Sequence, residues 1–325
     1  MSLLDVTGLR VRFRGPMGEA EAVRGVSLSV DEGEVLGIVG ESGSGKSVTM
    51  MAALQLLPAG ARIEGSAVFG GRQLVGMGGE EIRRIRGKEI GCIFQDPLSA
   101  FNPVMTIGDQ IAEAIRLHEA VPQRAALDRA AGLLEMVSIP EPRRRLAQYP
   151  FEFSGGMRQR AMIAMALANQ PKLLIADEPT TALDVTVQAQ ILELLQKLRS
   201  ELGLAIVLIT HDLGVVAGMA DRIAVMYGGR IVEEGPVDPV FYETAHPYTR
   251  GLIAAIPSPD RPAGELTSIE GTPPSIWTRP KGCAFHPRCP VATDICRSDD
   301  PVLRDAGGTA TACHHAGAVP QEAQA

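Results

Sequence analysis

The spacing of hydrophobic residues along the chain predicts an α/β fold with a parallel sheet at its centre. Apolar and polar residues alternate over 9–13, the period of a half-exposed antiparallel strand. Three short runs, 35–39, 172–176 and 205–210, are almost wholly apolar, as expected of strands buried on both faces. A helical pattern near 185–202 separates the last two runs, and this β-α-β order predicts parallel pairing.

Other segments extend this pattern in both directions. We expect, in chain order, a strand over 26–30, a turn at 31–33, a helix from about 46 to 56, edge strands near 66–74, helices within about 103–169 (including 110–119 and 123–137), and a hairpin over 223–233 that turns at Gly228-Gly229. Prolines become frequent after about residue 241, and proline breaks helices and central strands. We therefore predict a loop-rich extension over 241–325, with a disordered tail from about 316.

Composition narrows the possible partners. The chain has 325 residues, a net charge of −7 and only 4% aromatic residues, which argues against nucleic acid as a partner. No apolar run approaches the roughly 18–20 residues that span a bilayer, and the first dozen residues lack a signal peptide's apolar stretch. We expect a cytoplasmic protein that reaches a membrane only through a partner.

A glycine-rich segment follows the buried run 35–39 and precedes a predicted helix. Residues 40–47 read Gly-Glu-Ser-Gly-Ser-Gly-Lys-Ser and match the phosphate-loop pattern G-x-x-x-x-G-K-[ST]. The glycines let backbone amides converge on phosphates, Lys46 adds a positive charge, and the Ser47 hydroxyl suits Mg²⁺. The predicted nucleotide-binding residues of this loop are Gly40, Ser42, Gly43, Gly45, Lys46 and Ser47.

Two acidic residues close the buried run that begins at 172. We expect Asp177 to hold the Mg²⁺ shell and Glu178 to act as general base toward an attacking water. The long separation between Lys46 and Asp177 leaves room for an inserted helical subdomain, unlike a minimal GTPase. The chain also lacks the guanine-reading tetrapeptide Asn-Lys-x-Asp, so we predict ATP as the nucleotide.

At Phe153-Ser154-Gly155-Gly156-Met157 the sequence resembles the nucleotide-binding subunits of ABC transporters, and the resemblance covers residues 1 to about 240. Their signature normally ends in glutamine, whereas the form with Met157 is that of peptide importers. The resemblance implies that Ser154, Gly155 and Gly156 contact the ATP of an opposite subunit, and that Thr181-Ala182-Leu183-Asp184 contacts the dimer partner. It also implies that Gln95 senses the γ-phosphate, Mg²⁺ and the transport domain. By the same resemblance, His211 is the switch histidine and Phe13 stacks on adenine.

The same resemblance implies the architecture and the mechanism. Residues 1–240 would form a P-loop ABC-type nucleotide-binding domain with a RecA-like parallel sheet core, an antiparallel β subdomain and a helical subdomain at about 100–170. Two such cassettes would sandwich two ATP molecules. Glu178 and His211 would carry hydrolysis with Gln95, and closure would pull on membrane-embedded partners.

The extension resembles the carboxy-terminal region of dipeptide/oligopeptide transport ATPases, through His246-Pro-Tyr-Thr-Arg-Gly-Leu252 and Gly282-Cys-Ala-Phe-His-Pro-Arg-Cys-Pro290. It implies an ATPase that powers peptide import from the cytoplasmic face of the inner membrane. The implied partners are a second ATPase subunit (the same or a different chain), two transmembrane permeases and an extracytoplasmic peptide-binding protein. Related systems import nickel, so nickel or another small solute is the alternative, and a non-transport ABC ATPase of repair or translation is less favoured.

Four of the chain's cysteines lie in this extension, and they are Cys283, Cys289, Cys296 and Cys313. Their spacing is not that of a common zinc ribbon, and a reducing cytoplasm disfavours disulfides. Four thiolates could hold a [4Fe–4S] cluster, as in some members of the resembling family, or Zn²⁺, or they could remain free thiols. We expect the nearby histidines to be bystanders, namely His286, His314 and His315.

Overall fold

The structure is a computed structural model that describes residues 2–16, 18–181, 183–256 and 269–316. Its contacts group into two compact units. The phosphate-loop unit comprises Ser2–Val30, Val35–Gly76 and Thr210–Ala325, and the helical unit comprises Asp31–Glu34 and Met77–Ile209. The predicted disordered tail falls almost entirely on residues outside this description, and the predicted domain boundary near 240 stays a prediction.

An antiparallel sheet forms one part of the phosphate-loop unit. Its order is β2-β1-β4-β5, with β1 at Ser2–Gly15, β2 at Gly18–Asp31, β4 at Arg62–Phe69 and β5 at Arg72–Gln73. The register of β1 against β4 shifts next to Gly8, whose φ is 57°. This bulge moves the buried face from Leu4 and Val6 to Leu9 and Val11, which explains the odd-numbered alternation seen in the sequence.

A second group of strands in this unit follows the order β11-β12-β10-β9-β3. The fully buried β3 (Val35–Val39) pairs in parallel with β9 (Arg222–Tyr227), and β9 pairs with β10 (Arg230–Pro236) as the predicted hairpin. Gly228 and Gly229 both have positive φ, 54° and 84°, as a tight hairpin turn requires. The short β11 (Arg304–Asp305) and β12 (Ala310–Thr311) of the extension were not predicted.

The helices of the phosphate-loop unit are short. They are α1 (Lys46–Ala53), α9 (Leu213–Ala217), α10 (Val237–Tyr242), α11 (Pro247–Ala254), the 3₁₀ turn His286–Arg288 and α12 (Asp294–Ser298). The predicted end of α1 at residue 56 was wrong. Leu54 caps the helix and Gln55 adopts a left-handed φ of 53°, which turns the chain away.

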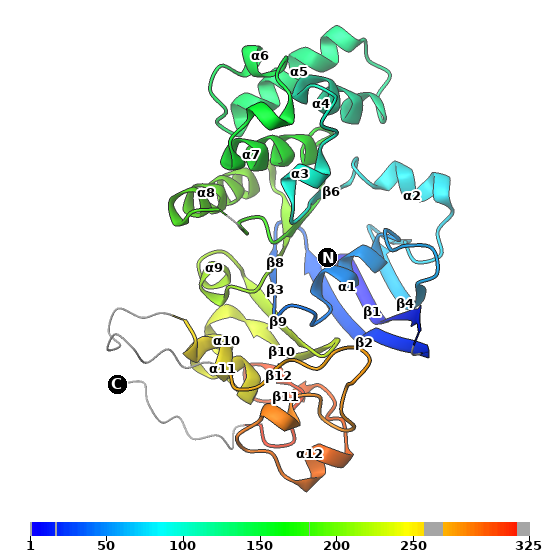
Figure 1. Cartoon of the computed structure of the whole chain (residues 1–325), viewed down its shortest axis with the longest axis vertical. Coiled ribbons are helices and arrows are strands. Elements are labelled where there is room, and N and C mark those ends of the chain that lie inside the picture. The colour runs from blue at the N-terminus through cyan, green and yellow to red at the C-terminus, as the bar shows by residue number, and fades with distance from the viewer. Residues whose placement is uncertain (1, 17, 182, 257–268, 317–325) are drawn as a thin grey trace. The chain divides into compact units, whose positions relative to one another are not determined.

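The helical unit contains three parallel strands in the order β8-β7-β6, at Ala205–Thr210, Leu173–Asp177 and Ile90–Ile93. The helix α8 (Val185–Leu202) joins β7 to β8 and confirms the predicted β-α-β order. The other helices are α2 (Gly79–Ile85), α3 (Pro97–Ala100), α4 (Ile107–Arg116), α5 (Gln123–Met136), α6 (Pro142–Arg145), the 3₁₀ turn Pro150–Glu152 and α7 (Gly155–Ala166); Figure 1 shows α4 to α7 clustered together.

Side-chain caps set where these helices begin. Thr106 accepts a hydrogen bond from the Asp109 amide, so α4 starts three residues before the predicted 110. Ser154 and Asp184 cap α7 and α8 in the same way. The elements α2 and β6 were not predicted, because they are short and lie next to loops without a clear period.

Candidate active site

The phosphate loop has the backbone geometry that its glycines allow. Gly40, Gly43 and Gly45 have φ of 151°, 78° and 103°, conformations that side chains disfavour. A Cβ on Gly40 would lie 2.2 Å from the carbonyl oxygen of Met226, whereas one on Gly43 would meet no atom of the described residues within 4 Å. The loop is therefore packed against β9 at Gly40 and open at Gly43, which suits an incoming phosphate.

Two polar groups inside the loop fit an anionic ligand. Lys46 is 5% exposed, and its Nζ donates to the carbonyl oxygens of Gly40 at 2.6 Å and Glu41 at 3.0 Å. The Ser44 hydroxyl is buried and has no hydrogen-bond partner among the residues that the structure describes. Ser47 is half-buried in the first turn of α1, and Ser42 is exposed. A buried ammonium and an unsatisfied hydroxyl beside open backbone are features of a phosphate cradle.

The predicted acidic pair lies at the end of β7 in the helical unit. Asp177 is buried at 6% exposure and is the last residue of the strand. Glu178 follows with a left-handed φ of 48°, and its amide donates to the carbonyl oxygen of Ile209 at 2.8 Å. A non-glycine residue held in this region is strained, and such strain often occurs at functional sites. The turn leaves the Glu178 side chain half-exposed beyond the sheet.

The structure brings Gln95 and Glu178 together. The Gln95 side-chain amide donates to Oε2 of Glu178 at 3.0 Å, and the Thr181 hydroxyl donates to the same oxygen at 2.8 Å. Gln95 follows β6 closely, so parallel pairing of β6 and β7 places it beside Glu178. The contact from Thr181 was not predicted, although its position three residues after Glu178 in a turn would have allowed it.

The predicted signature forms the exposed start of α7. Ser154 caps this 12-residue helix by accepting a hydrogen bond from the Met157 amide at 3.3 Å, and both Ser154 and Gly155 are exposed. A Cβ on Gly156 would lie 2.9 Å from Val187, so a larger residue does not fit. An exposed, glycine-rich helix start is open to an anion from outside the chain.

The remaining predicted residues are Asp184, His211 and Phe13. Asp184 caps α8 by accepting from the Val187 amide at 3.0 Å, and its neighbour Ala182 lies outside the described residues. His211 is exposed directly after β8, and Phe13 is half-buried on β1. Lys46, Ser47, Phe13 and His211 belong to the phosphate-loop unit, while Gln95, Asp177, Glu178, Ser154 and Asp184 belong to the helical unit.

The four late cysteines line one small pocket, and they are Cys283, Cys289, Cys296 and Cys313. The other side chains that line this cavity include His246, Phe285, His286, His314 and His315. Cys296 is buried at 6% exposure on α12, and its Sγ lies 3.7 Å from the Thr293 hydroxyl. Its carbonyl oxygen accepts from the Cys283 amide at 2.9 Å, so the backbone ties these two cysteines together.

The expectation of a metal site formed by Cys283, Cys289, Cys296 and Cys313 is not supported by their placement. Among the described residues, no group of three or more His, Cys, Asp or Glu side chains is placed to hold a metal ion. Arg304 lies near Cys313 and favours its thiolate, but burial has the larger effect on this thiol. Burial raises the pKa of Cys283 to about 11 and also raises the pKa of Cys289 and Cys313, so these thiols hold their protons at neutral pH.

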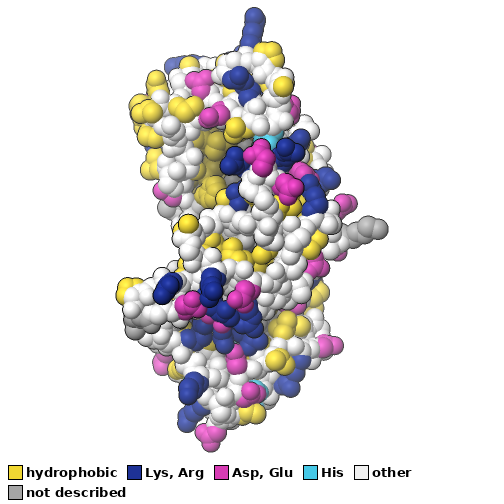
Figure 2. Space-filling model, turned by 90° about the vertical axis from the view of Figure 1, so that its right-hand side faces the viewer, with side chains coloured by type: hydrophobic (Ala, Val, Ile, Leu, Met, Phe, Trp, Pro, Cys, Tyr) yellow, Lys and Arg dark blue, Asp and Glu magenta, His cyan; other side chains and the backbone are white. Residues whose placement is uncertain are grey.

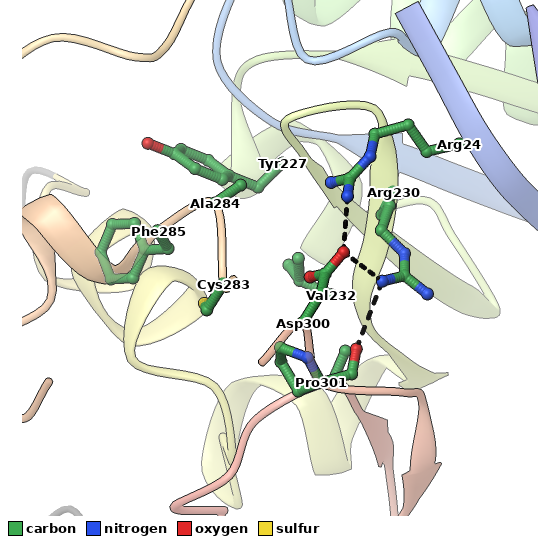
Figure 3. A pocket seen from close by; sticks show the side chains of 10 residues that line it. Arg24, Tyr227, Arg230, Val232, Cys283, Ala284, Phe285, Asp300 and Pro301 are labelled. Atoms are coloured by element: carbon green, nitrogen blue, oxygen red, sulfur yellow. Dashed lines mark hydrogen bonds and ion pairs between the residues drawn. The ribbon is translucent and has the colours of Figure 1, made fainter. Parts of the chain in front are cut away.

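Cys283 also lines a second small pocket, shown in Figure 3. There Asp300 accepts from Arg24 at 2.5 Å and from Arg230 at 2.7 Å, and both guanidinium groups point toward its carboxylate. These contacts join the extension to β2 and β10. They fasten the extension and add no group to the phosphate loop.

Comparison with known proteins identifies the family of this chain. The family model described as ABC transporter matches residues 23–181, and the model described as oligopeptide/dipeptide transporter, C-terminal region, matches residues 232–296. The chain is 50% identical to the oligopeptide transport ATP-binding protein OppD of Salmonella typhimurium, covering 96% of this chain and 93% of that one. It is 49% identical to the dipeptide transport ATP-binding protein DppD of Bacillus subtilis, covering 90% and 88%.

Solved structures share the fold. The ATP-binding cassette MJ0796, a dimer in a post-hydrolysis state with ADP and phosphate, is 30% identical with a TM-score of 0.65, covering 72% of this chain and 98% of that one. CbiO1 of Clostridium perfringens is 26% identical with a TM-score of 0.62, covering 75% and 92%. The chain therefore belongs to the ATP-binding subunits of ABC transporters, in the group that carries the oligopeptide/dipeptide transporter C-terminal region.

Proposed function

We propose that this chain is the ATP-hydrolysing subunit that powers import of dipeptides or oligopeptides through an ABC transporter. The observation that carries the proposal is the extension: its match to the oligopeptide/dipeptide C-terminal region spans 232–296, and relatives named for peptide transport share about half of their residues over nearly the whole chain. The residues of the ATP site do not indicate which substrate is transported. The extension is therefore the feature that favours a peptide as the substrate.

The proposed ATPase chemistry gives each predicted residue a role. Lys46 and the phosphate-loop amides bind the β- and γ-phosphates, and Phe13 stacks on adenine. Glu178 accepts a proton from the attacking water, in an orientation set by Gln95 and Thr181. His211 assists at the γ-phosphate.

Mg²⁺ fits the oxygen donors of this site. Ser47, Asp177 and Gln95 would hold the ion directly or through water, and hydroxyl and carboxylate oxygens are the ligands that Mg²⁺ prefers. When bound, Mg²⁺ neutralises charge on the β- and γ-phosphates. Asp177 lies at the end of β7 and supplies a carboxylate to this donor set.

The second half of each ATP site comes from another cassette. Ser154, Gly155 and Gly156 expose the start of α7, while this chain's own phosphate loop already supplies one cradle. We infer that the signature completes the site of a second ATPase subunit, of the same or a different chain, and that the loop ending at Asp184 contacts that subunit. A related cassette is dimeric in its solved structure.

Membrane attachment is assigned to partner subunits. Among the described residues, no helix is long and apolar enough to cross a membrane. Phe94, Leu98 and Val104 flank Gln95 with 37%, 56% and 79% of their surface exposed, and Figure 2 shows hydrophobic side chains exposed on the face it displays. We propose that this segment docks onto two transmembrane permeases at the cytoplasmic face of the inner membrane, in a system fed by an extracytoplasmic peptide-binding protein.

We also propose that the four late cysteines hold a [4Fe–4S] cluster, with Zn²⁺ as the alternative. The support is that four soft donors from separate parts of the extension line one cavity. Binding would require the raised-pKa thiols to lose their protons and all four side chains, that of the buried Cys296 included, to turn toward the bound group. A group bound in this way would add stability to a proline-rich segment.

A reconstituted transporter tests the main proposal. The purified chain, its partner ATPase and the two permeases are placed in liposomes, and ATP hydrolysis is measured with the binding protein loaded with a dipeptide, an oligopeptide or Ni²⁺. We expect stimulation by a peptide and none in the Lys46→Ala variant. Stimulation by Ni²⁺ alone would contradict the peptide assignment while leaving the ATPase assignment intact.

A further inference from the structure

The extension contacts the phosphate loop at Glu41, the residue that follows Gly40 in the G-x-x-x-x-G-K-[ST] pattern. Arg288 forms a bidentate ion pair with Glu41: Nη1 donates to Oε2 at 2.6 Å, and Nη2 donates to Oε1 at 3.0 Å. The Glu41 amide donates to the hydroxyl oxygen of Tyr248 at 2.8 Å. All three residues lie in the phosphate-loop unit, although Arg288 is 247 positions from Glu41 in the sequence.

Arg288 is held rigidly before any ligand arrives. Its side chain is 5% exposed, and each of its N–H donors has a partner. Besides Glu41, these partners are the carbonyl oxygen of Glu270 at 2.9 Å, the carbonyl oxygen of Ile269 at 3.1 Å and the hydroxyl of Tyr227 at 3.3 Å. A buried guanidinium with all donors satisfied cannot turn away without breaking several hydrogen bonds at once.

Tyr248 is equally fixed. Its ring is fully buried at the start of α11 and packs on Tyr227, with ring centroids 4.6 Å apart, and on Phe285, at 5.4 Å. The guanidinium of Arg288 lies 5.8 Å from the Tyr227 ring and 6.0 Å from the Phe285 ring. Figure 3 shows Tyr227 and Phe285 on the same side of the cavity that they line. An aromatic cluster therefore supports both groups that hold Glu41.

These contacts bear on ATP in two ways. The carbonyl oxygen of Glu41 also accepts a hydrogen bond from Nζ of Lys46 at 3.0 Å. Glu41 is therefore held through its amide, its carbonyl and its carboxylate. In addition, a carboxylate in a loop that binds a triphosphate would repel the ligand unless a cation neutralises it. Arg288 supplies that charge from a buried position, where salt screens it weakly.

We propose that Arg288 and Tyr248 are positioning residues for ATP binding: they hold the phosphate loop in its binding shape, and Arg288 cancels the charge of Glu41. The extension is thereby part of the nucleotide site as well as a mark of the transporter group. This proposal rests on ATP binding at the phosphate loop, as the proposed function requires.

The test is the dissociation constant of a fluorescent ATP analogue, measured on the full chain. We expect Arg288→Met to weaken binding about tenfold, because it leaves the Glu41 carboxylate uncompensated. The double variant Glu41→Gln with Arg288→Met is expected to bind within about threefold of the parent, since the unpaired charge is gone. Tyr248→Phe, which keeps the ring and removes the acceptor, is expected to weaken binding by about threefold.

Three controls sharpen this test. Arg297→Met removes an exposed arginine of the extension that pairs with Asp294, and it should bind ATP as the parent does. Thermal unfolding identifies variants that fail to fold. If Arg288→Met fails to fold, Arg288→Lys replaces it, because lysine keeps the charge but cannot pair with both carboxylate oxygens at once. We expect Arg288→Lys to bind ATP at least about threefold more weakly than the parent. In steady-state assays with the partner cassette, KM for ATP should rise while kcat at saturating ATP stays within about twofold.

Two results would overturn the proposal. One is parent-like ATP binding by a folded Arg288 variant. The other is a double variant that binds as weakly as the single one, since this would show that Arg288 only holds the extension together. Loss of ATP binding by the parent itself, matching a Lys46→Ala variant, would instead contradict the proposed function.

Discussion

The side-chain amide of Gln95 donates a hydrogen bond to the carboxylate of Glu178 at 3.0 Å, across 83 positions of sequence. Thr181 donates to the same carboxylate oxygen at 2.8 Å, so two donors orient the side chain proposed as the general base. Glu178 also has a left-handed backbone, which directs its side chain out from the end of β7. The proposed base is thus held in place by its neighbours before nucleotide binds.

Removing the hydroxyl of Thr181 tests whether this orientation matters. In Thr181→Val the shape is kept but Glu178 loses one donor, and we expect kcat for ATP to fall about tenfold with KM little changed. Thr181→Ser keeps the hydroxyl and should retain most of the activity. Equal rates for the valine and serine variants would show that the hydrogen bond is irrelevant to turnover.

Gln95 is expected to have a larger effect, because it contacts Glu178 and lies in the segment proposed to dock on the permeases. Gln95→Ala should hydrolyse ATP at least about tenfold more slowly in the assembled transporter. The comparison that separates the two roles is the basal ATPase of the detached cassettes. A variant slowed only in the assembled transporter would place Gln95 in coupling and leave the orientation of Glu178 to Thr181.

The sequence was informative where function demands particular residue types. The phosphate loop, the two acids at the end of β7 and the hairpin glycines could be predicted because few residues allow positive φ, phosphate contact or general-base chemistry. The ends of α1 and α4 could not, since they depend on the backbone of Gln55 and on the Thr106 cap.

Contacts between distant segments were beyond the sequence. Glu41 is held by Tyr248 and Arg288, which both come from the proline-rich extension. No local sequence pattern connects these two residues to the phosphate loop. The strand β12 has two residues, too few to show a period, yet it pairs with β10.

The late cysteines were predicted only in part. Their residue type and their density in one segment suggested that they gather in space, and all four line one cavity. Their type could not show how each side chain is turned or how deeply each is buried, as Cys296 is against Thr293. The absence of a tight ligand group among the described residues was therefore not expected.

Glu233 is predicted to be a main attachment point of the extension. This fully buried carboxylate accepts from the Ala245 amide at 2.7 Å, the His246 amide at 3.1 Å and the Thr309 hydroxyl at 3.0 Å. Glu233→Ala would leave these donors unsatisfied and should lower the free energy of unfolding by about 3 kcal/mol in urea titrations. A loss below about 0.5 kcal/mol would show that water replaces the carboxylate at little cost.

The same residue should make stability depend on pH. Burial raises the pKa of Glu233 above its ordinary 4.5, so the folded chain holds this proton more tightly than the unfolded chain. The part of its stabilising contribution that depends on the bound proton is therefore complete below pH 4.5 and is lost as pH rises through the folded value. Glu233→Gln cannot titrate, and its urea stability should decline less over that window than the parent's. Parallel pH profiles would contradict this assignment.

The proposed cluster is tested by colour and metal content. Protein purified without oxygen is expected to be brown and to contain iron and sulfide, and Cys289→Ser should lose both. Cys92→Ser, which changes a cysteine in β6, should keep them. Zinc without iron would favour the alternative, and a colourless parent free of both metals would exclude a metal role for the four cysteines.

The most direct test of the account is ATP turnover by Glu178→Gln together with the partner cassette. Glutamine keeps the shape and the contact with Gln95 but cannot accept a proton, so we predict normal ATP binding, turnover reduced at least about a hundredfold, and accumulation of a closed pair of cassettes. Near-normal turnover by this variant would contradict Glu178 as the general base and, with it, the proposed mechanism.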